Sequence, residues 1–319
     1  MMQSRTRAVC GRVRRRAVRR RLRSENGQAF VLSLLFLTVL LGLSAGVLDV
    51  GVWYQHQRQL QARVDAAALA GAQALPDDPA AAKGLAATYG AKNGGLFDAT
   101  VQVTRGFAEN DTIRIEATRP SPGFLARIVG IKTIKVRATA AARGGMMKEA
   151  RGASPIAVDE KHPKLQCKPT PCFEQPTELE LEKVGPGAFR LVNIDGSKGG
   201  TGPPILADWI EFGYEGYMPL GWYNSDPGAK FNSSQVKEAL DRRIGTEMLY
   251  PVYRSTRGQG ANFEYDVVAW VGYHLTGYEI KGSKNNKLYG WFTRVIWEGI
   301  MSESGSGADF GVRVVSLVE

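Results

Sequence analysis

The most extended apolar stretch of the chain covers residues 29–48. It holds no charged side chain, and about 20 residues at ~1.5 Å per residue in a helix match the ~30 Å hydrocarbon core of a bilayer. The pattern therefore predicts a transmembrane helix over 29–48. This run is longer than that of a cleaved signal peptide, and no A-x-A site closes it, so we expect a retained anchor.

Beyond Asp49, small and apolar side chains continue along one face of a helix. They recur every three or four residues before Pro76, at Leu60, Val64, Ala67, Gly71 and Leu75. This period is helical, so the span should continue as a stalk helix outside the membrane. The small residues at 67 and 71 permit close packing, either on a second helix in a homo-oligomer or on a sheet of their own domain.

The polar and apolar pattern next predicts a small α+β domain within residues 49–142. Asp78 should cap a helix that begins at Pro79 and ends before two glycines. Two alternating stretches then predict a hairpin, which a short helix and a third strand follow. The expected positions of these elements are 99–104, 112–118, 123–129 and 131–141.

Residues 143–154 have mixed charge and little periodicity, so we expect a linker there. The region 155–319 predicts a mostly β domain, a sandwich or a barrel, with one or two helices. A helix is expected from an Asn232 cap to Gly245, and segment 221–228 is interpreted as turns because it is rich in Gly, Asn, Asp and Pro. Further elements are expected at 188–194, 204–213, 248–253, 263–273, 288–297 and 310–318. The overall fold class is α+β.

The positive charge of the chain is concentrated at its N-terminal end. Residues 1–26 hold ten arginines and one acid, Glu25, which accounts for nine of the formal net charge of +10. By the positive-inside rule, the basic tail over 1–28 stays in the cytoplasm and everything after Asp49 is exported. No aromatic side chain interleaves the arginines to stack on bases, so nucleic acid is not an expected partner.

Two cysteines, Cys167 and Cys172, lie close together in the exported region. In an oxidising compartment this pair predicts a disulfide that closes a short loop. A metal site would need His162 as a third ligand at irregular spacing, and we expect no metal.

Candidate catalytic chemistry is sparse. The sequence lacks Walker and H-E-x-x-H motifs, and it has no G-x-S-x-G pattern outside the predicted membrane span. His274 is the one plausible general base, and it would need Ser225 and Asp226 beside it to form a catalytic triad. Asp195 begins a partial metal-adhesion motif that we interpret as a turn. The chain is therefore predicted not to be an enzyme and to need no cofactor.

An aromatic-rich segment runs from Trp209 through Trp222 to Tyr223. Exposed aromatic rings give a large contact area at small entropic cost, so Trp209 and Trp222 are candidates for contact with a partner or a cell-wall glycan. Packing in the core is the ordinary alternative for both.

The N-terminal region resembles that of TadE/TadG-like proteins of the Flp pilus (tight adherence) assembly system. The residues that carry the resemblance are Gly27-Gln28-Ala29, Leu48-Asp49-Val50-Gly51 and the run 64–72, VDAAALAGA. It implies a bacterial inner-membrane protein whose partners are pilins or other pilus-assembly proteins. Pilin-like members carry Glu five residues after a cleavage Gly, whereas Leu32 stands there in this chain, so we expect the leader to remain.

Two acids belong to the matched motif. Asp49 lies where the helix leaves the bilayer and is expected to stay hydrated at the interface. Asp65 has no basic residue three or four positions away, so it is either solvated or paired with another subunit or the exported domain. The sequence predicts a membrane-anchored, non-catalytic component of pilus assembly or a related envelope complex. The alternative is a tethered adhesin or glycan-binding module.

Overall fold

The computed structural model describes the chain from residue 26 to residue 318 with short gaps. The described ranges are 26–168, 170–181, 188–228, 230–282, 286–303 and 308–318. The basic tail predicted over 1–28 lies outside them except for residues 26–28. The chain divides into two compact units, one containing the chain up to Val52 together with residues 123–132, and the other containing the rest.

A single uninterrupted helix, α1 (Asn26–Ala72), forms the N-terminal part of the described chain. It is long and apolar enough to cross a membrane, and apolar side chains such as Phe30 and Leu43 are exposed on it. Farther along, Leu60, Val64 and Ala67 are completely buried. The predicted long helix with an apolar first part is confirmed.

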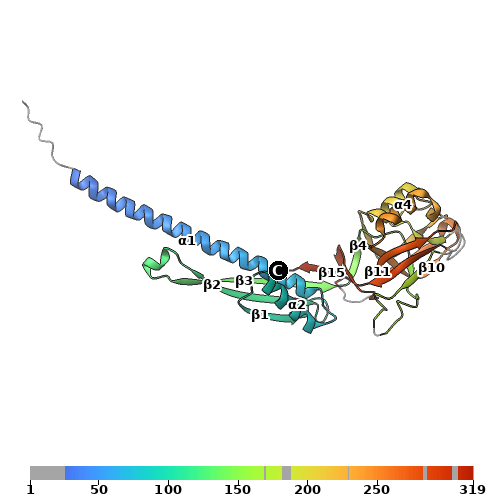
Figure 1. Ribbon diagram of the computed structural model, residues 1–319, viewed down its shortest axis with the longest axis horizontal. Coiled ribbons are helices and arrows are strands. Elements are labelled where there is room, and N and C mark those ends of the chain that lie inside the picture. Colours follow the sequence, from blue (N-terminus) through green and yellow to red (C-terminus); the bar gives the residue numbers. More distant parts are fainter. Residues whose placement is uncertain are drawn as a thin grey trace, which may run out of the picture. The chain divides into compact units, whose positions relative to one another are not determined.

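The region after α1 contains a helix and three antiparallel strands (Figure 1). Asp78 accepts hydrogen bonds from the backbone N–H groups of Ala80 and Ala81, as predicted for the start of α2. Ile113 and Ile115 on β2 pack against the buried face of α1 because alternate side chains of a strand share one face. The elements are α2 (Pro79–Lys92), β1 (Asp98–Thr104), β2 (Thr112–Pro122), the 3₁₀ turn η1 (Ala126–Val129) and β3 (Thr133–Gly145).

The last strand of the chain extends this sheet. β15 (Val312–Leu317) pairs antiparallel with β3, and β13 (Val295–Ile296) pairs parallel with β15, so the order is β1-β2-β3-β15-β13. Gly144 of β3 lies so close to the end of α1 that an added Cβ would be 2.2 Å from the Ala72 carbonyl oxygen. The pairing of β15 with β3 was not predictable from local pattern.

The remaining strands form a mostly β region with two sheets. The larger has the order β5-β10-β11-β12-β6, with β9 between β7 and β11, and the smaller has the order β14-β4-β8. The strands of the two sheets together are β4 (Met147–Arg151), β5 (Val158–Asp159), β6 (Thr177–Glu180), β7 (Ala188–Val192), β8 (Tyr217–Pro219), β9 (Gly221–Pro227), β10 (Glu247–Arg257), β11 (Glu264–Glu279), β12 (Lys287–Thr293) and β14 (Gly299–Met301). The mostly β character is confirmed.

Both faces of the central strand β11 are covered, as its continuous apolar run predicts. Val271 and Tyr273 belong to one buried cluster together with residues of α3 (Pro203–Glu211) and α4 (Ser234–Arg243). Val267 and Trp270 belong to a second cluster. The strand is therefore the centre of the β-rich region.

Three local predictions need correction. Segment 221–228 is mostly strand β9 rather than turns, because its backbone bonds to β7 and β11 outweigh local turn propensity. The cap of α4 is Ser233, whose hydroxyl accepts from the Val236 N–H, and not Asn232. The stretch 143–154 contains the end of β3 and all of β4. The domain limits at 142 and 155 stay a prediction.

Candidate functional site

Asp49 is buried at the end of the apolar run of α1. Its side chain is only 2% exposed. Oδ1 accepts from the Phe124 N–H at 2.7 Å, and Oδ2 accepts from the N–H of Leu125 at 3.0 Å and from that of Ala126. The expectation that this carboxylate stays hydrated is therefore corrected, because a loop 75 residues further along the chain supplies its donors.

The loop that binds Asp49 runs over residues 123–132 between β2 and β3. It contains η1, whose preceding residue Leu125 offers no capping side chain. The first N–H groups of a helical turn have no partner inside the turn and attract negative charge. Asp49 satisfies these donors from a distant element, whereas Asp78 satisfies those of α2 from the adjacent position.

The same face of α1 meets the end of β2 one and two turns further on. The Trp53 indole Nε1–H donates to the Pro122 carbonyl at 3.2 Å. His56 Nδ1 lies 2.6 Å from the hydroxyl of Ser121, which is fully buried. Positions 49, 53 and 56 are spaced like Leu60 and Val64, so the buried face of the helix begins at Asp49.

Asp65 lies on the same helix in a half-buried position. The Gln61 side-chain amide donates to Asp65 Oδ1 at 2.7 Å and to the Thr139 carbonyl oxygen of β3 at 2.8 Å. Gln61 thus connects Asp65 to the sheet through its second donor. In the described ranges the partner of Asp65 is on its own helix, and contact with another subunit stays a prediction.

The small residues of α1 pack within their own chain. Ala67 is fully buried. A Cβ added at Gly71 would lie 2.6 Å from Ile113 Cδ1 of β2 and 2.9 Å from the Ala82 carbonyl oxygen of α2. The sequence allowed these small residues to pack either on a second helix in a homo-oligomer or on a sheet of their own domain. In the structure they pack on the sheet and on α2 of the same chain. A homo-oligomer through α1 would need a different face of the helix.

The two candidate tryptophans have different environments. Trp209 is 7% exposed and meets the Tyr214 ring edge-on, with 5.9 Å between ring centroids. Trp222 is 40% exposed, and the Arg257 guanidinium lies 4.1 Å from the centroid of its ring. Trp209 is a core residue, whereas Trp222 is available at the surface.

Cys167 and Cys172 are joined by a disulfide, with 5.5 Å between their Cα atoms. The third residue considered for a metal site, His162, accepts a hydrogen bond at Nδ1 from the Lys164 N–H, and its ring packs edge-on against Phe292. No group of three or more His, Cys, Asp or Glu side chains suited to a metal occurs among the residues that the structure describes.

The candidate triad is not assembled. His274 Nδ1 lies 3.0 Å from Glu247 Oε1, and its ring stacks on Trp291. Ser225 and Asp226 are on β9, which pairs with the start of β11. At ~3.3 Å per residue of strand, they are roughly 30 Å from His274. Asp195 instead accepts from the Ser197 N–H in the predicted turn.

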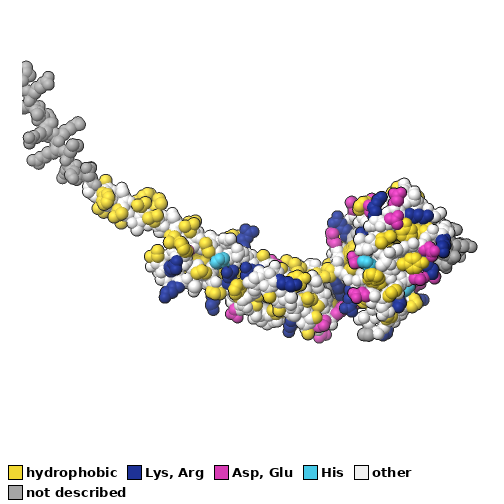
Figure 2. All heavy atoms as spheres, in the orientation of Figure 1, with side chains coloured by type: hydrophobic (Ala, Val, Ile, Leu, Met, Phe, Trp, Pro, Cys, Tyr) yellow, Lys and Arg dark blue, Asp and Glu magenta, His cyan; other side chains and the backbone are white. Residues whose placement is uncertain are grey.

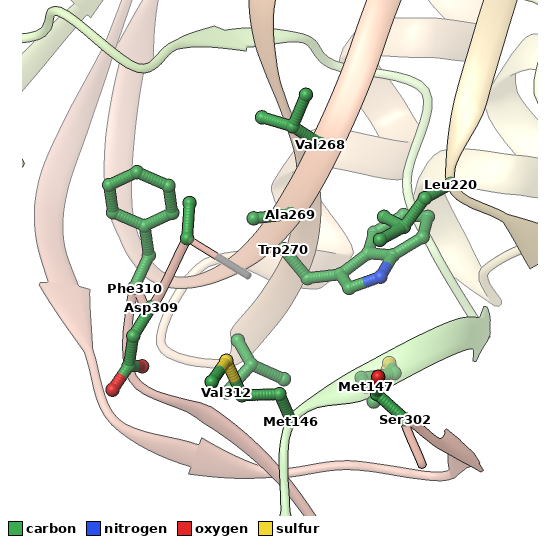
Figure 3. A pocket seen from close by; sticks show the side chains of 11 residues that line it. Met146, Met147, Leu220, Val268, Ala269, Trp270, Ser302, Asp309, Phe310 and Val312 are labelled. Carbon is green, nitrogen blue, oxygen red and sulfur yellow. The ribbon is translucent and has the colours of Figure 1, made fainter. Parts of the chain in front are cut away.

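One small cavity in the β-rich region is shown in Figure 3. It measures about 30 Å³ and is lined by apolar side chains such as Met147, Trp270 and Phe310. Such a volume has room for little more than one water molecule.

Comparison with known proteins identifies one segment. Residues 27–74 match the model of the Tad family, which is described as Flp pilus-assembly TadE/G-like. No curated protein and no solved structure matches the chain. The resemblance seen in the sequence is confirmed over this segment, which contains the apolar run, Asp49 and the buried face of α1.

Proposed function

We propose that the chain is a membrane-anchored, non-catalytic component of Flp pilus assembly or of a related cell-envelope complex. The observation that carries this proposal is the family match over residues 27–74. The matched segment includes Asp49 and the helix face that packs on β2 and α2. In this proposal, the residues of the family motif belong to the membrane anchor and also pack against the region that is exported.

In the proposed topology, residues 29–48 cross the bacterial inner membrane once. The tail over 1–28 is cytoplasmic, and the domains over 49–142 and 155–319 are exported together with the segment between them. The arginine-rich tail and the exposed apolar side chains of α1 support this orientation. Alkaline phosphatase fused after residue 319 should be active, and an inactive fusion beside an active cytoplasmic reporter would reverse the orientation.

Other pilus-assembly proteins or pilins are the proposed partners. A deletion strain complemented with the full chain should regain pili, and a photo-crosslinker at Tyr54, which is 60% exposed, should capture such proteins. The matched control places the crosslinker at Leu60, which is fully buried. Normal pili in the deletion strain would contradict the proposed function.

A tethered adhesin or glycan-binding module is the second candidate, and the exposed ring of Trp222 favours it. If it is correct, Trp222→Ala should weaken binding of the full chain to cell-wall glycans while pili still form. We propose no catalytic role, so His274→Ala should leave pilus assembly unchanged in a stably folded variant.

A further inference from the structure

We propose that the loop over residues 123–132 inserts into the outer interfacial layer of the same membrane that α1 spans. Its apolar side chains would contact lipid, and its basic side chains would contact anionic lipid phosphates. This inference rests on the proposed topology and adds a second lipid contact that lies outside the segment matched by the family model. The chain would thus contact the bilayer through two segments, α1 and the loop.

The position of the loop follows from Asp49. This residue comes directly after the predicted span, and its carboxylate binds the loop backbone at Phe124, Leu125 and Ala126. The headgroup layer on each side of the hydrocarbon core is roughly 5–8 Å thick. A backbone held by hydrogen bonds to the first residue beyond the span therefore lies at the depth of the headgroups.

The loop also exposes large apolar side chains at this depth. Phe124 is 65%, Ile128 79% and Ile131 45% exposed. The value for Ile128 is the highest among the exposed large apolar side chains in the described part of the chain. The part of α1 that directly precedes Asp49 is also apolar, since Leu48 is 61% exposed. Because this surface faces lipid in the proposed topology, the apolar loop is continuous with a lipid contact.

Charge on the loop complements a phospholipid surface. Residues 123–132 contain Arg127 and Lys132 and no acid, and both basic side chains are exposed. The Arg127 Nε–H donates to the Phe124 carbonyl at 2.8 Å, and the Arg127 guanidinium lies 5.6 Å from the centroid of the Phe124 ring. Figure 2 shows Lys and Arg side chains beside apolar ones at this loop. Basic and aromatic groups together are typical of segments that lie in a membrane interface.

The test places an environment-sensitive fluorophore at Ile128 of the full chain. An Ile128→Cys variant, with Cys10→Ser to remove the free thiol, is labelled and reconstituted in phosphatidylglycerol vesicles that contain brominated lipid. Matched variants carry the label at Leu43 in the span and at Ile244, which is 44% exposed on the surface beyond α4. We expect quenching at Ile128 several-fold stronger than at Ile244 and close to that at Leu43.

The controls separate this inference from the proposed function. Quenching at Leu43 with none at Ile128 would overturn the loop contact and leave the anchor intact, whereas no quenching at Leu43 would overturn the anchor and the loop contact with it. A further Arg127→Ala, Lys132→Ala pair should reduce the Ile128 signal about twofold or more in anionic vesicles. A crosslinker at Ile128 that captures a pilin instead of lipid would assign the loop to a protein interface and contradict the inference.

Discussion

Asp49 and Asp65, the two acids of the helix segment that matches the family model, differ in their hydrogen-bond partners. Asp49 is almost completely buried and binds three consecutive backbone N–H groups of a loop 75 residues further along the chain. Asp65 is half-buried and accepts from Gln61 of its own helix. One acid closes a long-range contact, whereas the other is supported locally.

This difference shows that the motif has two structural roles. At its first acid, the helix is joined to the loop over residues 123–132 by hydrogen bonds to a carboxylate. Farther along, small side chains such as Gly71 bring the helix into direct contact with β2 and α2. We therefore expect substitutions to act through packing at one end and through lost hydrogen bonds at the other.

The largest effect is expected for Gly71→Val. Its side chain would meet Ile113 and the carbonyl oxygen of Ala82, which as backbone cannot move aside. Such overpacking costs about 3 kcal/mol, and thermal unfolding of the purified chain should show the loss. Gly84→Ala is the matched control, because a Cβ there meets nothing within 4 Å. Equal stability of the two variants would mean that α1 does not pack closely on this sheet.

The next largest effect is expected for Asp49→Ala. The variant leaves the N–H groups at the start of η1 without their acceptor, so the loop should loosen and Tm should fall by about 5 °C. Asp49→Asn keeps one acceptor oxygen and should fall less. If both variants have the Tm of the wild type, the hydrogen bonds of Asp49 to the loop do not stabilise the fold, and the proposed difference between Asp49 and Asp65 is wrong.

A pH-dependent effect of intermediate size is expected at Asp111. Burial raises the pKa of this carboxyl, but bonds from the N–H groups of Gly106, Phe107 and Ala108 and from the Thr112 hydroxyl outweigh burial and lower it. A lowered folded-state pKa contributes stability above the unfolded value of about 3.9, and this stability is lost as the pH falls below it.

Asp111→Asn should therefore lower stability at neutral pH and weaken the decline of stability below about pH 4. Urea unfolding at a series of pH values measures both changes. An unchanged pH profile in Asp111→Asn would show that bonding by three backbone N–H groups, the arrangement shared with Asp49, does not favour the charged form.

The smallest effect on stability is expected for Asp65→Ala. Gln61 keeps its bond to the Thr139 carbonyl, so the free energy of unfolding should change by at most about 0.5 kcal/mol. Pilus assembly in a complemented deletion strain provides a separate measurement. Lost assembly with unchanged stability would support the predicted partner in another subunit, and normal assembly would remove that prediction.

Sequence reasoning succeeded where the signal is local. The apolar run of α1, the Asp78 cap of α2 and the hairpin of β1 and β2 each depend on neighbouring residues. It failed where distant segments meet. The donors of Asp49 and the pairing of β15 with β3 depend on contacts that no periodicity records.

Strand β9 is a second case in which contacts between distant segments override the local pattern. Its Asn, Asp, Pro and Gly residues favour turns locally, yet pairing with β7 and β11 makes the segment a strand. Among the candidate site residues, the burial of Trp209 and the exposure of Trp222 could not be told apart, because both lie in the same aromatic-rich stretch.

Hydrogen exchange of the Leu125 amide, measured in the full chain in a lipid nanodisc, tests the bond between Asp49 and the loop most directly. This N–H donates to Asp49 Oδ2 at 3.0 Å. We predict slow exchange in the wild type, faster exchange in Asp49→Ala and no change in Asp65→Ala. Rapid exchange in the wild type, or equal protection in wild type and Asp49→Ala, would contradict the account.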